Sequence, residues 1–165
     1  AALLRARQRA STRPVQRSIT VDAPAEVLHA RWRDPDLLTQ IMQPLGTVTA
    51  DPSGGGALRW RVVGPFGRTI EWVTRIVEDQ PPRLIRWVTV DGAPIESGGS
   101  VEFRQDRPEL GTTVTLRLRL GIAIPHLVPK MGIAKILRRF KSLVETGEVP
   151  TLEHNPSARA SALAY

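Results

Sequence analysis

The amino-acid sequence predicts an α+β fold in which a seven-stranded antiparallel sheet wraps around a long C-terminal helix. Two observations support this prediction. Between residues 47 and 120, apolar and polar residues alternate with the period of two typical of half-buried strands, and turns rich in Gly, Pro and Asp divide this region into six segments. Residues 130–146 instead carry apolar residues at helical spacing. With one strand and two short helices before them, the predicted order is β-α-α-β6-α.

The region before residue 47 predicts one strand and two helices. Alternation over residues 15–21 predicts the strand. Residues 22–26 are typical of a helix start, since they place a proline in the first turn and a glutamate at the positive end of the helix dipole. Asp34-Pro35 interrupts this helix, and Asp34 is the expected N-cap of a second short helix that ends before Pro44.

The six remaining strands are joined by short turns, as in an antiparallel meander. They are expected at residues 47–50, 58–62, 70–80, 84–90, 99–104 and 111–120. The triplet Gly54-Gly55-Gly56 lies between two of these strands. It therefore predicts a hairpin turn and not a phosphate-binding loop, which would precede a helix.

The helix predicted at residues 130–146 is amphipathic. Its apolar stripe consists of Ile133, Ile136, Leu137, Phe140, Leu143 and Val144. Gly147 is the expected C-cap, and Pro150 stops the helix. A sheet with one apolar face must cover that face, and only this helix is long enough to do so.

The chain length of 165 residues predicts one domain, assigned to residues 14–150, with a basic leader at 1–13 and a tail at 151–165. The net charge is +7, and residues 1–17 contribute five arginines and no acidic residue. The absence of cysteine excludes disulfides, iron–sulfur clusters and thiolate zinc sites, and the three histidines lie far apart in the sequence. No metal and no cofactor is therefore predicted. No apolar segment approaches the ~20 residues that cross a bilayer.

Four segments resemble bacterial proteins of the polyketide cyclase/dehydrase (SRPBCC, START-like) superfamily. They are RSITVDAPAEV at 17–27, WRD at 32–34, GPFGRTIEW at 64–72 and LRRFKSLVETGE at 137–148. The resemblance implies the helix-grip fold, which START domains and pollen allergens also have, and a cavity that binds a hydrophobic or aromatic molecule. Cyclases of this superfamily place arginine and tyrosine in the cavity. The only tyrosine here is Tyr165, in the tail, so no catalytic residue is carried over.

Large apolar side chains of the sheet and the last helix are the expected cavity lining, although each would serve equally well as ordinary core. They are Trp60, Trp72, Trp87, Phe103, Leu118, Ile133, Leu137 and Phe140. Trp60 and Trp72 each share parity with neighbouring apolar residues. The orientation of Trp87 is left open, because a slip of one residue moves a strand's side chains to the other face.

An enzyme of this class would need an acid or base inside the cavity. Glu71 and Glu102 alternate with apolar residues and are therefore expected to point to solvent. His126, which lies just before the last helix, is expected to be either a structural histidine or a polar gate at the cavity mouth. The alternation thus supplies no inward carboxylate.

The polar side of the last helix is basic. Lys135, Arg138 and Arg139 are predicted to face either solvent or an anionic membrane surface, where each basic residue contributes roughly 1 kcal/mol. The basic residues are not accompanied by base-stacking aromatic residues along a groove, so nucleic acid is an unlikely partner. The expected location is the cytoplasm, either free or held at the membrane.

The sequence therefore predicts a domain that binds a hydrophobic small molecule, a lipid or an aromatic polyketide-like compound, between the sheet and the last helix. One alternative is an enzyme, a polyketide cyclase or dehydratase. A second is a membrane- or partner-binding module with a vestigial cavity. The identity of the ligand and the oligomeric state are left open.

Overall fold

The computed structural model describes residues 14–64, 67–90, 92, 97–120 and 132–149. The predicted leader at 1–13 and the predicted tail at 151–165 lie outside these ranges. The described elements are β1 (Val15–Val21), α2 (Ala25–Trp32), α3 (Pro35–Met42), β2 (Gly46–Ala50), β3 (Leu58–Val63), β4 (Thr69–Gln80), β5 (Leu84–Thr89), β6 (Ser97–Arg104), the short 3-10 helix η2 (Pro108–Leu110), β7 (Thr112–Leu120) and α5 (Ile133–Thr146).

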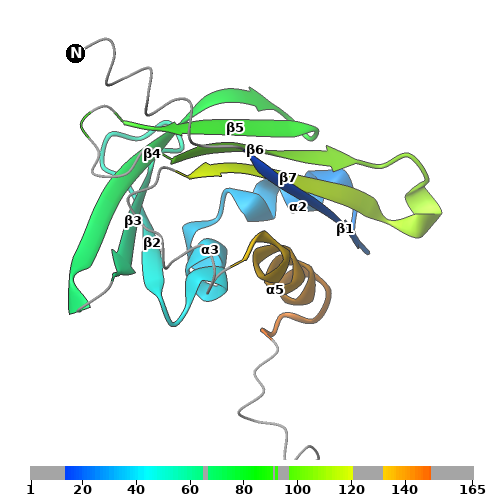
Figure 1. Cartoon of the computed structure of the whole chain (residues 1–165). Coiled ribbons are helices and arrows are strands. Elements are labelled where there is room, and N and C mark those ends of the chain that lie inside the picture. The colour runs from blue at the N-terminus through cyan, green and yellow to red at the C-terminus, as the bar shows by residue number, and fades with distance from the viewer. Residues whose placement is uncertain (1–13, 65–66, 91, 93–96, 121–131, 150–165) are drawn as a thin grey trace, which may run out of the picture.

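All seven strands form one antiparallel sheet in the order β1-β7-β6-β5-β4-β3-β2. Strands β2 to β7 form a meander, and β1 closes its far edge by pairing with β7. The sheet is strongly curled, and α2, α3 and α5 all lie on its concave side (Figure 1). This is the helix-grip fold, so the predicted fold class and the predicted order of elements are confirmed.

Helix α5 covers the sheet with its apolar stripe, as predicted. Leu137 and Phe140 are 1% and 0% exposed, and Ile133 and Leu143 are also buried. The helix ends at Gly147, which adopts φ 76° and donates its N–H to the Leu143 carbonyl at 3.0 Å. A left-handed residue at this position is the usual helix C-cap, and glycine adopts it without strain.

Helix α3 begins with the predicted cap. The Asp34 carboxylate accepts the Asp36 N–H at 2.9 Å and so satisfies one free donor of the first turn. Inside the helix, the Thr39 hydroxyl donates to the Val48 carbonyl at 2.9 Å and accepts the Val48 N–H at 2.8 Å. These bonds fasten α3 to the edge strand β2, since they use backbone groups that β3 does not pair.

Strand β4 contains an irregularity that the sequence did not predict. Its register against β5 shifts between Ile76 and Glu78, so Val77 is an extra residue at a β-bulge. Ile76 lies opposite Trp87, whereas Asp79 lies opposite Ile85. The bulge reverses the alternation, and Asp79 therefore shares the inner face with Ile85.

Candidate functional site

The candidate site is built on the inner, concave face of the sheet. Residues directly opposite each other on antiparallel strands point to the same face. The register pairs Trp60 with Trp72, and it pairs Trp87 with both Ile76 and Gly99 on its two neighbouring strands. Gly99 in turn lies opposite Leu118. The three strand tryptophans and Leu118 therefore share the inner face, and Trp87 has the same orientation as Trp60 and Trp72.

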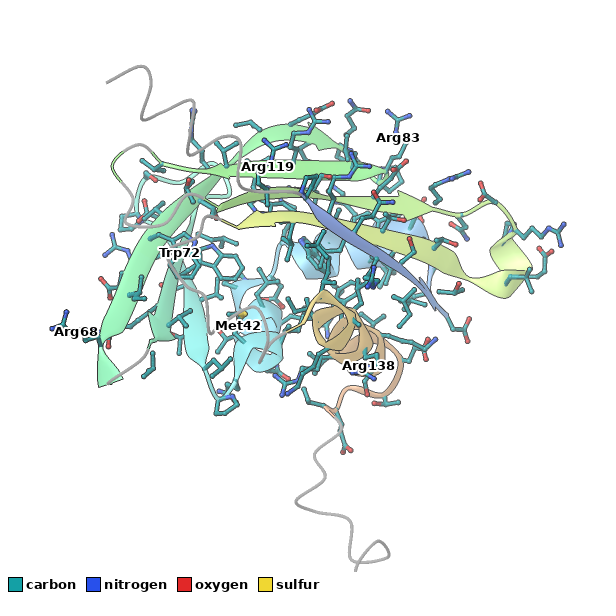
Figure 2. All side chains as sticks on the ribbon, in the orientation of Figure 1. Met42, Arg68, Trp72, Arg83, Arg119 and Arg138 are labelled. Carbon is teal, nitrogen blue, oxygen red and sulfur yellow. The ribbon has the colours of Figure 1, made fainter. Side chains whose placement is uncertain are left out.

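Trp60 and Trp72 form a stacked pair, with ring centroids 6.1 Å apart and ring planes 4° from parallel. The Trp60 Nε1–H donates to the Thr74 Oγ1 at 2.8 Å. The Trp72 ring is 7% exposed, and its Nε1–H has no hydrogen-bond partner among the described residues. Figure 2 shows Trp72 on the concave side of the sheet. The pair thus contains one satisfied and one unsatisfied indole donor.

Trp87 forms a second aromatic contact. Its ring centroid lies 6.4 Å from that of Trp32 in α2. Trp32 also meets Phe140 of α5 edge to face at 4.9 Å. Gly99 makes room for the Trp87 ring, because a Cβ at that position would lie 2.8 Å from the Trp87 Cζ2. Trp32 therefore belongs to the inner-face cluster. It was not among the residues predicted to line the site, although it follows Leu28 on the apolar side of its helix.

Burial divides the inner face into two regions. We call the first the packed half; it consists of Leu28, Val101, Phe103, Val114, Leu116, Leu137 and Phe140, all of them buried. We call the second the tryptophan half; it consists of Trp60, Ile70, Trp72, Thr74, Ile76, Trp87 and Leu118. Only Trp72 and Thr74 of the tryptophan half are fully buried, and the other five side chains are partly exposed.

The eight side chains predicted to line a cavity are divided between these environments. Phe103, Ile133, Leu137, Phe140 and Trp72 are buried within the core cluster. Trp60, Trp87 and Leu118 keep partly exposed apolar surface on the inner face. Ile70 and Ile76, which the sequence showed on the same parity as Trp72, share this environment. His126, predicted to be either a structural histidine or a polar gate, lies outside the described residues.

One carboxylate does lie on the inner face. His29 of α2, 7% exposed, contacts the Asp79 Oδ1 through its Nε2 at 2.6 Å. The other Asp79 oxygen lies 3.2 Å from the Arg33 Nη1, so both oxygens have basic partners. The His29 ring also packs against Phe103, with centroids 6.2 Å apart. The sequence analysis missed Asp79 because the bulge at Val77 reverses the alternation there.

The two glutamates considered as catalytic candidates point outward, as predicted. Glu71 is exposed and forms an ion pair with Arg61 at 3.0 Å, and Glu102 is exposed as well. The described residues contain no group of acidic, histidine or cysteine side chains that could hold a metal ion. In the part of the chain that the structure describes, acid–base chemistry on the inner face would therefore depend on His29 and Asp79.

The three basic residues predicted on the outer side of α5 differ in their contacts. Lys135 and Arg138 are exposed, and Arg138 is labelled in Figure 2. Arg139 is half-buried, and its Nη1 donates to the carbonyls of Ile41 and Gln43 at 2.5 and 2.6 Å. Burial lowers the pKa of the Arg139 guanidinium. Arg139 thus joins α5 to the C-terminal end of α3, and of the three predicted residues only Lys135 and Arg138 are exposed.

Comparison with known proteins places this geometry in a family. Residues 12–145 match the family described as polyketide cyclase/dehydrase and lipid transport. The chain belongs to this family. A search of curated proteins found no match. No helix in the described ranges has both the length and the apolar character needed to span a membrane.

Solved structures from several bacteria share the fold. A protein of Deinococcus radiodurans is 33% identical, with a TM-score of 0.65 over 82% of this chain and 100% of its own. A protein of Chromobacterium violaceum is 20% identical, with a TM-score of 0.62 over 80% of this chain and 96% of its own. The Zhui aromatase/cyclase of a Streptomyces species is 18% identical, with a TM-score of 0.61 over 84% of this chain and 99% of its own. The last two similarities, at such low identity, demonstrate a common fold only.

Proposed function

We propose that this family member binds an apolar small molecule, a lipid or an aromatic polyketide-like compound, against the tryptophan half and helix α5. The observation that carries this proposal is the incomplete burial of large apolar side chains on the inner face, above all Trp60, Trp87 and Leu118. Large apolar side chains stabilise a protein most when they are buried. Side chains that remain partly exposed on an inner face are therefore available to a bound guest.

The expected affinity follows from the area that a guest would bury. Burial of ~300 Å² of apolar ligand surface would contribute roughly 7 kcal/mol before ordering costs, at ~25 cal/mol per Å². Micromolar binding therefore requires no catalytic group and no charged contact. The assignment of the family to both cyclases and lipid transport supports either class of guest.

Native mass spectrometry of the purified protein tests the proposal directly. We expect an apolar molecule to co-purify with the folded chain and to be released on denaturation. Oleic acid and an anthraquinone, titrated separately, should change the intrinsic tryptophan fluorescence. Trp87→Ala should weaken binding about tenfold, whereas Val88→Ala, on the outer face of the same strand, should leave it unchanged. Absence of any bound molecule together with unchanged fluorescence would contradict the proposal.

A second candidate function, a cyclase or dehydratase, is favoured by the His29–Asp79 pair alone. Both Asp79 oxygens contact basic side chains. The group that takes a proton from a C–H of the substrate would therefore be the His29 imidazole. An aromatase/cyclase with the same fold supports the idea only at the level of architecture. Incubation of the protein with a linear poly-β-ketone thioester should then give cyclised product, and His29→Gln should abolish its formation. Equal yields with and without protein would exclude this candidate.

We further propose that Lys135 and Arg138 bring the ligand site to an anionic membrane surface. Both side chains are exposed on α5, which also carries the buried stripe beneath the sheet. Alanine at either position should lower binding to vesicles containing phosphatidylserine about fivefold, because each basic residue near such a surface contributes roughly 1 kcal/mol. Arg61→Ala, on the outer sheet face, is the matched control. Equal binding to neutral and anionic vesicles would contradict this proposal.

A further inference from the structure

The tryptophan half contains a buried hydrogen-bond donor that the protein does not use. Trp72 is 7% exposed, and its Nε1–H has no partner in the described part of the chain. Most buried polar groups in proteins are hydrogen-bonded, because an unpaired buried donor loses its bonds to water without compensation. An unused donor in a family of small-molecule-binding proteins indicates a partner that arrives with the ligand.

The polar groups around Trp72 do not supply an acceptor. An indole N–H can only donate, and both members of the stacked pair are indoles. The Thr74 oxygen already accepts the Trp60 N–H at 2.8 Å. Thr74 is 4% exposed, and no hydrogen bond joins its hydroxyl to Trp72. In the described part of the chain, the Trp72 Nε1–H is therefore a buried donor without an acceptor.

Water does not account for the missing partner. The Trp72 Nε1 has less than 1 Å² of accessible surface, which leaves almost no room for a water molecule against it. A partner can reach the nitrogen only if a neighbouring side chain moves.

We infer that Trp72 is a specificity-determining residue whose Nε1–H donates to an acceptor oxygen of the ligand. The preferred guest is then an apolar molecule with a carbonyl-type oxygen, such as a ketone, a quinone or an ester, and not a pure hydrocarbon. This inference rests on the proposed function, because it names the chemistry of the molecule bound at the tryptophan half. It adds directional recognition to a site otherwise defined by apolar area.

The test compares two probes that differ mainly in one oxygen, 2-acetylnaphthalene and 2-ethylnaphthalene. Calorimetric titration should show that the wild-type chain binds the ketone about three- to tenfold more tightly, as one net hydrogen bond gives. Trp72→Phe keeps the aromatic ring but removes the donor, so it should reduce this ratio to about one. Val88→Ala, on the outer face of β5, is the control and should keep the preference.

An NMR measurement on the wild-type chain tests the same inference even if Trp72→Phe does not bind or fold normally. In protein labelled with ¹⁵N-tryptophan, the indole resonance absent from Trp72→Phe identifies Trp72. In the wild-type chain this resonance should move downfield with 2-acetylnaphthalene and much less with 2-ethylnaphthalene.

The outcomes separate the inference from the proposed function. If both probes bind with equal affinity, or if Trp72→Phe retains the preference for the ketone, the inference is wrong while the apolar site stands. If neither probe nor oleic acid binds, the proposed function fails and the inference fails with it. The inference is supported if Trp72→Phe alone loses the preference for the ketone and if the Trp72 indole resonance moves downfield when the ketone binds.

Discussion

The packed half and the tryptophan half occupy one continuous face of the same sheet, yet they differ in burial and in polarity. In the packed half, Val101, Val114 and Phe140 are each 0% exposed, so strand and helix side chains fill the space between the two layers. In the tryptophan half, large rings are stacked but incompletely covered, and a buried donor is left without an acceptor. Core packing explains the packed half. The tryptophan half has features that core packing leaves unexplained, and the proposed binding of a guest would account for them.

The largest expected effect tests whether the two regions carry different shares of the stability. Phe140→Ala in the packed half should lower the free energy of unfolding by about 3–5 kcal/mol, since it leaves a cavity among buried neighbours. Trp60→Ala should cost less, about 1–2 kcal/mol, because the ring is only partly buried. Chemical denaturation measures both values. Equal losses in the two variants would show that the tryptophan half is ordinary core.

A smaller effect is expected at Gly99, where the tryptophan half requires a residue without a side chain. Its Cβ would lie 2.5 Å from the Arg117 carbonyl oxygen and 2.8 Å from the Trp87 ring. Gly99→Ala should therefore cost about 1–3 kcal/mol of stability and also weaken ligand binding through Trp87.

The neighbouring glycine is the matched control. A Cβ at Gly98, on the outer face, would approach no atom more closely than 3.4 Å, which is an ordinary contact. Gly98→Ala should therefore change the free energy of unfolding by less than about 0.5 kcal/mol. Similar losses for the two glycines in thermal unfolding would show that crowding at Trp87 is not what requires glycine at position 99.

Much of this fold could be predicted from the sequence because it follows from repeated patterns. Alternation over many residues predicted the strands, and it also predicted the outward orientation of Glu71 and Glu102. The stripe of α5 predicted which of its residues would be buried. These features depend on local periodicity, which a single residue rarely disturbs.

The features that the sequence analysis missed depend on a single irregular residue or on contacts between residues far apart in the sequence. One extra residue at Val77 places Asp79 on the inner face, and no turn residue in the sequence signals this bulge. Parity placed Trp60 and Trp72 together but could not tell which ring would be buried with an unused N–H. Arg139 was grouped with Lys135 and Arg138 by helical spacing, whereas its contacts depend on where α3 ends.

The polar link at the bulge, between Asp79 and its basic partners, should contribute less stability than the buried Phe140 ring. Asp79→Asn removes the charge between His29 and Arg33 and should cost about 1–2 kcal/mol, since the His29 side chain is 8% exposed. Glu71→Gln, which removes an exposed ion pair on the outer face, should cost less than about 0.5 kcal/mol. Urea denaturation at neutral pH compares the two. Equal costs would show that the inward position of Asp79 adds no stability.

The smallest expected effect concerns pH, at the edge of the packed half where α5 meets the turn after β1. The Asp22 N–H donates to the Glu145 Oε2 at 2.8 Å, and Lys141 lies 3.1 Å from the same oxygen. The Asp22 backbone hydrogen bond, aided by Lys141, lowers the pKa of the Glu145 carboxyl. A lowered pKa in the folded state means that ionised Glu145 stabilises the fold above its unfolded pKa, and that this stabilisation is lost as the pH falls through the folded value.

Glu145→Gln should therefore reduce stability at pH 7 and should flatten the loss of stability between about pH 5 and pH 3. Solvent screening keeps the difference below about 1 kcal/mol, because Glu145 is exposed. Urea denaturation of both chains across this pH range measures the difference.

Ligand binding at pH 7 should be unaffected by Glu145→Gln, because the contact lies on the packed half. If the variant matched the wild type in stability at every pH, the Glu145 contact would add nothing to the attachment of α5. If it lost ligand binding, the two halves would be coupled through this helix.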